Sequence, residues 1–338
     1  MADTYRVAFI GLVHDHAWGE LPHWLECPNC QVVAAADPNS ELTQRAQTKG
    51  VPSVYSDWRE MAEAEEFEIA AIFVPNSDAA EVVEALAPRG VHFVVEKPMA
   101  ARLAQADRML AAVRAANVEL LINWPIAWRP TLYEAHRRLV AGEVGHPFYM
   151  NVYMGHQGPK EIGCSEYFYS WLYDATKNGA GALMDYCCYG AALANWWFGR
   201  PTAVQAVAGL LTKDYLTVED NAIITLLYPN LFVETQGSWS TVPGHHDMVL
   251  RGDAGTLYTS ESYRTLHIAV GNKPFEEVAA PSLPEHQSNA AHYLTWCLRE
   301  GRPVEGFCSA QVGRDAQEVL EAGLLSASQG RRLELPLS

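Results

Sequence analysis

The octapeptide VHFVVEKP, residues 91–98, decides how this chain folds. Its β-branched and aromatic first half predicts a buried strand. Lys97 follows at the carboxyl end of that strand, where open α/β sheets place their ligands. Partial burial there would lower the pKa of Lys97 and make it a usable proton acceptor. Alone, the motif is equally compatible with a solvated Lys–Pro turn, so its meaning depends on the surrounding sequence.

Strands and helices alternate on both sides of this stretch, up to residue 123. Strands are predicted at residues 6–10, 31–36, 54–55, 69–74, 91–95 and 119–123. Helices are predicted between them, one ending near residue 25 and the others at 40–49, 57–65, 79–89 and 105–116. Right-handed crossovers would join these strands into a parallel, doubly wound sheet.

The pattern changes after residue 123. Longer alternating strands are predicted at residues 146–154, 202–211, 221–227, 232–239, 248–252 and 256–259, with helices at 129–141, 288–300 and 310–330. Turn signals between several of these strands favour an antiparallel sheet. We therefore expect an α/β protein with a domain boundary near residue 122, dividing it into residues 1–122 and 123–338.

The composition narrows the classes of function. The chain has 338 residues, 24 basic and 40 acidic, for a net charge of −16. A nucleic acid or an anionic membrane needs a basic surface, so neither is an expected partner. No stretch approaches the ~20 apolar residues of a membrane span. The N-terminal residues resemble no targeting segment, so a cytoplasmic location is expected.

The seven cysteines are odd in number and scattered, which argues for reduced thiols rather than a disulfide framework. Cys27 and Cys30 have CxxC spacing, but a zinc site would need a second ligand pair. The motif precedes a strand, whereas a redox motif normally opens a helix. A loop without redox or metal function is expected there.

A nicotinamide dinucleotide site is predicted at the first strand–turn–helix unit. Asp37 ends the second strand, 26 residues after Gly11, and can hydrogen-bond both ribose hydroxyls of NAD. The same carboxylate would repel the 2′-phosphate of NADP, so NAD is the expected cofactor. The alternative for Asp37 is an ordinary residue of an Asp–Pro turn. The glycine fingerprint is poor, because Val13 and His16 stand where the second and third glycines belong.

No metal is expected. His14 and His16 could form a ligand pair, but an i, i+2 spacing would place them on different faces of a helix. His245, His246 and Asp247 could also bind an ion, although adjacent histidines rarely share one.

At this point the sequence resembles the Gfo/Idh/MocA oxidoreductase family over essentially its whole length. The matching segments are residues 6–11, 34–39, 74–76, 96–98, 129–130, 178–185, 218–220 and 326–330, with 335–336. The resemblance implies a Rossmann domain followed by an α/β domain with a large, open, mainly antiparallel sheet. It also implies a homodimer or homotetramer formed through that sheet, which suits a broad exposed surface.

The resemblance implies a catalytic set of Lys97, Asp185 and Tyr189. Tyrosine at the third position replaces the family's histidine, as in the glucose–fructose oxidoreductase and dihydrodiol dehydrogenase branch. Asp185 and Tyr189 are i, i+4 and would project from one helix face. The alternatives are a packing role for Tyr189 and a helix N-terminal charge for Asp185.

The resemblance also suggests cofactor and substrate contacts. The cofactor-binding candidates are Gly11, Leu12, Val13, His14, Asp37, Pro38, Pro75, Asn76, Glu96, Lys97 and Asn123. The substrate candidates are Arg129, His156, Trp171, Tyr173 and His245. The expected reaction is hydride transfer between nicotinamide and a secondary alcohol or ketone of a sugar, glycoside or cyclic polyol, with Lys97 transferring the proton. Glycoside cleavage through transient oxidation, and a non-catalytic dinucleotide sensor, are the alternatives.

Overall fold

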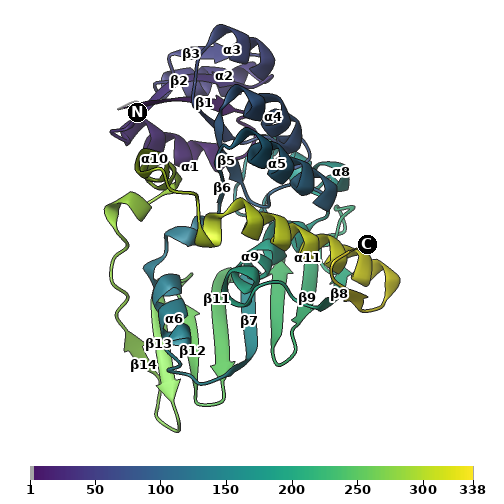
Figure 1. The fold of residues 1–338 in the computed structure, drawn as a ribbon. Helices are drawn as coiled ribbons and strands as arrows, with labels where there is room; N and C mark the ends of the chain where they lie inside the picture. Colours follow the sequence, from purple (N-terminus) through teal and green to yellow (C-terminus); the bar gives the residue numbers. More distant parts are fainter. Residues whose placement is uncertain (1–3, 338) are drawn as a thin grey trace.

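Two β-sheets organise residues 4–337, the part of the chain that this computed structural model describes (Figure 1). The first has six parallel strands in the order β3-β2-β1-β4-β5-β6. These are β1 (Tyr5–Ile10), β2 (Cys30–Ala36), β3 (Ser53–Tyr55), β4 (Ile69–Ile72), β5 (His92–Glu96) and β6 (Leu120–Asn123). The predicted doubly wound sheet is confirmed.

Five helices connect these strands: α1 (Ala17–Glu26), α2 (Ser40–Thr48), α3 (Trp58–Ala64), α4 (Ala79–Leu86) and α5 (Leu103–Ala116). Because helices cover both faces, strands such as β4 are apolar and buried at every residue. The strand order reverses between β1 and β4, which opens a crevice beyond their carboxyl ends. Lys97 follows β5, the neighbour of β4, and so lies at this edge of the sheet.

The second sheet has nine strands in the order β14-β13-β12-β11-β7-β10-β9-β8-β15. They are β7 (Pro147–Gly155), β8 (Ala203–Gly209), β9 (Asn221–Leu227), β10 (Phe232–Ser238), β11 (His245–Gly252), β12 (Gly255–Ser260), β13 (Thr265–Val270), β14 (Glu276–Val278) and β15 (Leu333–Glu334). All neighbours are antiparallel except β7 and β10, which run parallel. The expected mainly antiparallel sheet is confirmed.

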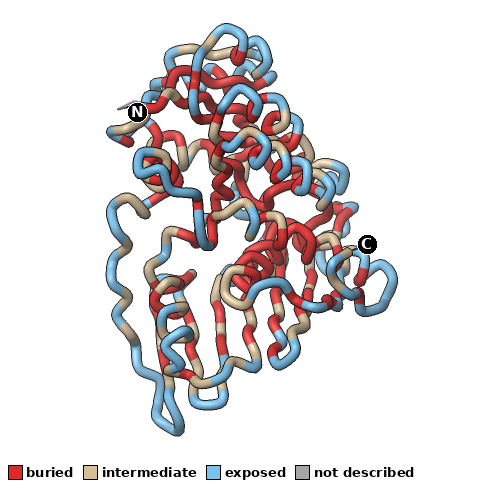
Figure 2. Tube along the Cα trace, viewed as in Figure 1, coloured by how far each residue is buried: buried red, intermediate tan, exposed pale blue. Residues whose placement is uncertain are grey.

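Helices cover only one face of this sheet (Figure 1). The helices that follow β6 in the chain are α6 (Pro130–Val140), α7 (Glu166–Leu172), α8 (Ala175–Asn178), α9 (Ala182–Phe198), α10 (Ala290–Glu300) and α11 (Ala310–Gln329). Of these, α10 lies beside α1 and contacts β6 of the first sheet (Figure 1). Along β7, Met150, Val152 and Met154 are buried, whereas Asn151 and Tyr153 between them are partly exposed. This alternation, visible along the strands in Figure 2, is that of a sheet with one packed and one open face.

Helix α9 is buried from Ala182 to Asn195 and lies against the centre of the second sheet. A Cβ on Gly190 would come within 2.4 Å of Thr235 Cβ on β10, so glycine permits this close packing. Helix α11 contacts α9 and also α5 of the first sheet, which ties the two halves together. Among the described residues, no helix is long and apolar enough to cross a membrane.

Candidate functional site

Lys97 and Asp185 form a buried ion pair where the two halves of the molecule meet. Lys97 Nζ lies 2.6 Å from Asp185 Oδ1 and 3.2 Å from the backbone carbonyl oxygen of Asp185. The second carboxylate oxygen accepts a hydrogen bond from Trp239 Nε1 at 2.9 Å. Nζ also lies 5.1 Å from the ring centroid of Tyr189, one turn along α9. The structure thus brings together the three predicted catalytic residues from strand β5 and helix α9.

The ion pair shifts the pKa of Lys97 in the direction opposite to the one expected. Burial alone would disfavour the ammonium, but the Asp185 carboxylate outweighs it and raises the pKa of Lys97 well above its usual value. The prediction of a lowered pKa was therefore wrong, because it considered burial without a partner. Burial likewise opposes ionisation of Asp185, yet the charge of Lys97 lowers the pKa of this carboxyl. Burial raises the pKa of Tyr189, so its phenol is neutral.

A cavity of about 270 Å³ opens beside this ion pair. Three histidines line it: His16 in the turn before α1, His156 just after β7 and His246 on β11. Burial lowers the pKa of His156 and His246, that of His246 to about 4, so these two rings are neutral at pH 7. The Nδ1 atom of His156 accepts a hydrogen bond from the backbone N–H of Gly158 (2.9 Å), which places the ring proton on Nε2. The cavity therefore offers neutral hydrogen-bonding groups beside a charged pair.

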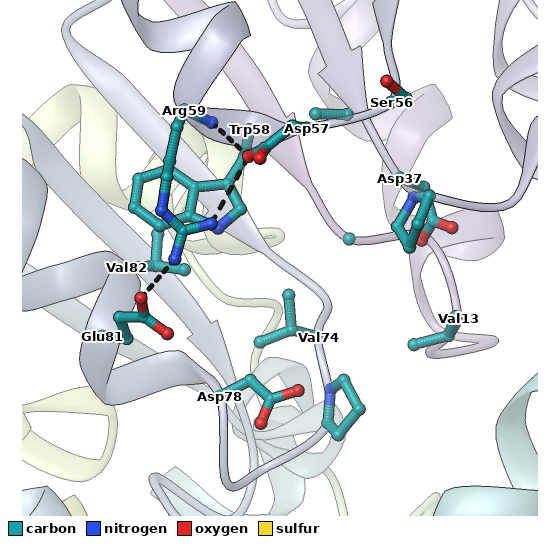
Figure 3. Close-up of a pocket in the computed structure, with 14 residues that line it drawn as sticks. Val13, Asp37, Ser56, Asp57, Trp58, Arg59, Val74, Asp78, Glu81 and Val82 are labelled. Carbon is teal, nitrogen blue, oxygen red and sulfur yellow. Dashed lines mark hydrogen bonds and ion pairs between the residues drawn. The ribbon is translucent and has the colours of Figure 1, made fainter.

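A second cavity, of about 430 Å³, runs along the carboxyl edge of the first sheet (Figure 3). Asp37 and Val13 lie on one side of it, and Arg59 and Glu81 on the other. The carboxylate of Asp37 accepts hydrogen bonds from the backbone N–H of Leu12 (2.6 Å) and from Asn39 (2.8 Å). Asp37 therefore anchors the turn after β1.

An arginine lies in this cavity, although sequence inspection identified none beside Asp37. The Arg59 guanidinium is ion-paired with Glu81, and it lies 3.4 Å from Asp57. It also stacks over the Trp58 ring at 4.4 Å. Two carboxylates thus offset its charge.

The glycine-poor turn, residues 11–16, packs against the second half of the molecule. Gly11 has a φ of 77°, and a Cβ there would lie 2.8 Å from the backbone nitrogen of Val74, so glycine is required. The Asp15 carboxylate accepts hydrogen bonds from the backbone N–H (2.7 Å) and hydroxyl (2.6 Å) of Ser165. The His14 ring lies 4.4 Å from the Phe168 ring on α7. The side chains of His14 and Asp15 therefore dock this turn onto α7 and the residue before it.

A third cavity, of about 590 Å³, lies between this turn and α7. It is lined by Val13, Pro75 and Trp171, among others. Trp171 is 7% exposed, and its Nε1 has no hydrogen-bond partner. Trp171 was predicted as a sugar platform, but it lines this cavity rather than the one beside Lys97. Val13 and Pro75 line both this cavity and the groove of Figure 3.

His14, His16 and Glu96 lie close together at the end of β5. His16 Nδ1 is 2.9 Å from one carboxylate oxygen of Glu96, and Asn123 Nδ2 donates to the other at 2.7 Å. The two imidazole rings are 4.5 Å apart. The expectation that these histidines diverge was wrong, because both precede α1 and belong to a turn rather than to a helix.

The remaining predicted residues are distributed more widely. Pro38 lines the groove of Figure 3, and Arg129 is exposed and lines the cavity beside Lys97. Asn76 donates to the Asn178 side chain at 2.8 Å, linking the two halves. The hydroxyl of Tyr173 accepts from the backbone N–H of Lys160 at 3.2 Å.

His245 stacks on Tyr153, with 4.5 Å between ring centroids, and its side chain is 53% exposed. It does not line the cavity beside Lys97; the adjacent His246 does. Tyr186 lines this cavity too, and sequence reasoning did not identify it. In the sequence, only the alternation of side chains along its strand pointed to His246 as an alternative to His245. Only its position next to Asp185 pointed to Tyr186.

Comparisons with known proteins agree with this architecture. Residues 5–124 match the NAD-binding Rossmann domain of the Gfo/Idh/MocA oxidoreductase family, and residues 133–258 match a C-terminal domain of the same family. D-apiose dehydrogenase of Paraburkholderia graminis is 25% identical, with the alignment covering 97% of this chain and 87% of that protein.

Two solved structures show the same fold. The aldose–aldose oxidoreductase of Caulobacter crescentus, in complex with glycerol, has a TM-score of 0.84 at 23% identity, covering 98% of this chain and all of that one. A levoglucosan dehydrogenase in complex with NADH and levoglucosan has a TM-score of 0.83 at 20% identity, covering 99% and 100%.

Proposed function

The chain belongs to the Gfo/Idh/MocA family of NAD-binding oxidoreductases, and we propose that it transfers hydride between NAD(H) and a secondary carbinol of a sugar, glycoside or cyclic polyol. The observation that carries the proposal is the buried Lys97–Asp185 ion pair beside a cavity, at the sheet edge where Rossmann domains bind nicotinamide. Related proteins include D-apiose, levoglucosan and scyllo-inositol dehydrogenases, which supports this class of substrate.

The groove along the sheet edge fits a dinucleotide. Gly11, with a φ of 77°, shapes the turn after β1, and Asp37 follows β2, where a ribose would be recognised. Nε1 of Trp171 is buried without a hydrogen-bond partner, and we propose that a shift of this side chain on cofactor binding presents it to a phosphate oxygen. We assign NAD rather than NADP, because Asp37 is acidic and the nearby Arg59 is offset by Glu81 and Asp57.

In the mechanism, bound nicotinamide supplies the hydride acceptor or donor. Lys97 donates a hydrogen bond to the substrate oxygen and stabilises the negative charge that develops there. During ketone reduction, the ammonium of Lys97 gives its proton to that oxygen. By microscopic reversibility, alcohol oxidation requires the neutral amine of Lys97, which the raised pKa makes scarce at pH 7.

The other groups position the substrate. Asp185 holds Lys97 in place, and Trp239 in turn fixes the carboxylate of Asp185. Tyr189 contributes a neutral phenol near Nζ. His156 and His246 offer uncharged hydrogen-bonding groups, which suits a neutral polyol better than an anionic sugar.

A panel of sugars, inositols and glycosides tests the proposal, with NADH formation as the readout. At least one neutral compound should be oxidised with NAD. The Lys97→Met variant should lose this turnover while binding NAD nearly as well as the wild type does. Retention of full activity in that variant would remove Lys97 from the proposed mechanism.

A second candidate is transient oxidation by a dinucleotide that stays bound. It is favoured by the docking of the dinucleotide turn onto α7, through Asp15 and Ser165 and through a 2.8 Å hydrogen bond from the Tyr167 hydroxyl to Glu41. Near-ultraviolet absorbance of the isolated protein separates the two candidates. Nucleotide that survives gel filtration and cycles without net NADH release supports the second.

We also propose that the open face of the nine-stranded sheet pairs with a second copy of the chain. Partly exposed side chains cover this face, and burial against an identical face would protect them. Light scattering coupled to gel filtration measures the mass directly, and a monomer at micromolar concentration would contradict this assignment.

A further inference from the structure

The turn before α1 and the end of β5 together form a compact set of metal-ligating side chains. Atoms of His14, His16 and Glu96 that could each bind an ion all lie within 4.8 Å of one another. His14 and Glu96 are buried, at 1% and 4% exposed, whereas the His16 side chain is 35% exposed. The set therefore combines two enclosed ligands with one that can be reached from the cavity beside Lys97.

From this geometry we propose that His14, His16 and Glu96 bind a divalent cation of the zinc class. Two imidazoles and one carboxylate are the donor types that Zn²⁺ prefers in three-ligand sites, which leave a fourth position for water. Ligands of one tetrahedral zinc lie about 3.4 Å apart, given bonds of about 2.0–2.1 Å. Because His16 is partly exposed, its rotation can bring the three donors to that spacing.

The hydrogen bonds around the set orient its ligands. Asn123 donates to one oxygen of Glu96, and its own carbonyl oxygen accepts from Trp128 Nε1 at 3.2 Å. The other oxygen of Glu96 already lies 2.9 Å from His16 Nδ1, which is within the range for two ligands of one ion. Such outer contacts to a ligating carboxylate are typical of metal sites. Binding would replace the contact between His16 Nδ1 and Glu96 and weaken the 3.2 Å bond from the His16 backbone N–H to His14 Nδ1.

The charges nearby favour a cation. Asp15, Glu96 and Asp185 are acidic, and Lys97 is the buried cation that faces them. Among these four side chains, three carboxylates and one ammonium leave an excess of two negative charges, although Asp15 is partly exposed. Arg129 also lines the cavity, but it is exposed, so water screens its charge. A divalent ion would balance this excess.

Metal titration of the full chain tests the proposal. Chelator-treated protein is titrated with ZnCl₂ by calorimetry, and with CoCl₂ by visible absorption. We expect one site per chain with the spectrum of nitrogen and oxygen ligands. The His16→Gln and Glu96→Gln variants should bind this ion at least tenfold more weakly. His245→Gln alters an exposed histidine outside the cluster and should bind as the wild type does.

Two controls keep the result interpretable. Thermal unfolding of each variant shows that it is folded, and Glu96→Gln preserves the shape of the side chain. A cobalt–thiolate charge-transfer band would show that cysteines such as Cys27, Cys30 or Cys164 are ligands, and it would overturn the proposal. So would a wild-type protein that binds no zinc, or a site that survives both His16→Gln and Glu96→Gln.

Discussion

Removing the charge of Asp185 should destabilise the protein in a way that depends on pH. The Asp185→Asn substitution keeps the shape of the side chain but leaves the ammonium of Lys97 buried, 4% exposed, without a counter-charge. Breaking a buried ion pair by removing one partner typically costs about 3–5 kcal/mol. Lys97 can instead lose its proton when the protein folds. Deprotonating a lysine with an ordinary pKa near 10.4 costs about 4–5 kcal/mol at pH 7, and this cost is the upper limit on the loss of stability. We therefore expect the free energy of unfolding to fall by about 3–5 kcal/mol at pH 7.

The sign of the pH dependence follows from the pKa shifts. In the wild type, the pKa of Lys97 is raised and that of Asp185 is lowered. The ion pair therefore stabilises the protein fully between the ordinary pKa values of aspartate and lysine, from about pH 4 to pH 10. In this range it does not make the free energy of unfolding depend on pH. In Asp185→Asn, burial lowers the pKa of Lys97, so the unfolded state binds more protons than the folded state. Its stability should then rise with pH between 7 and 10, by up to about 1.4 kcal/mol per pH unit.

Urea denaturation at several pH values measures both effects. Asp78→Asn is the matched control, because the ion pair of Asp78 with Lys177 is 41% and 44% exposed. Such a surface pair is worth about 0–1 kcal/mol. If Asp185→Asn costs no more than this control and has the pH slope of the wild type, then Lys97 is not held as a buried ammonium.

Three further predictions concern the cofactor and the reaction. Trp171→Phe keeps an aromatic ring but removes the free Nε1 donor, so NAD should bind roughly tenfold more weakly by calorimetry, as expected for a lost charge-assisted hydrogen bond. Trp197→Phe is the matched control, because Nε1 of Trp197 also has no hydrogen-bond partner but Trp197 lines none of the three cavities. This variant should bind NAD with the affinity of the wild type. Asp37→Ser should shift the ratio of kcat/KM values towards NADP, and an unchanged ratio would place specificity elsewhere. Because oxidation needs neutral Lys97, its kcat/KM should rise with pH from 7 to 9, and a flat profile would argue for a different proton acceptor.

The sequence alone predicted those elements of the structure that depend on the pattern of neighbouring residues. The apolar run before Lys97 predicted strand β5, because β-branched residues favour a buried strand. The alternation of strands and helices predicted the parallel sheet and therefore the edge where Lys97 lies. Asp185 and Tyr189 do lie one turn apart on a helix, α9, as was assumed for them, although residues 182–198 were not among the helices predicted from residue patterns.

The sequence alone did not predict the properties that depend on contacts between segments far apart in the chain. The pKa of Lys97 depends on Asp185, 88 residues away, so its direction could not come from burial alone. Histidines at positions 14 and 16 converge because α1 begins only at Ala17, and helix boundaries are poorly determined by sequence. Strand alternation shows that His245 and His246 face opposite ways but not which of them faces the cavity.

Isotope transfer tests the central claim most directly. A substrate identified in the panel is prepared with deuterium on the carbinol carbon and incubated with NAD, and the dinucleotide is then examined by NMR and mass spectrometry. Hydride transfer predicts one deuterium at the nicotinamide C4, with slower turnover of the labelled substrate when the chemical step limits the rate. Turnover of the labelled substrate with no deuterium in the dinucleotide would contradict the account.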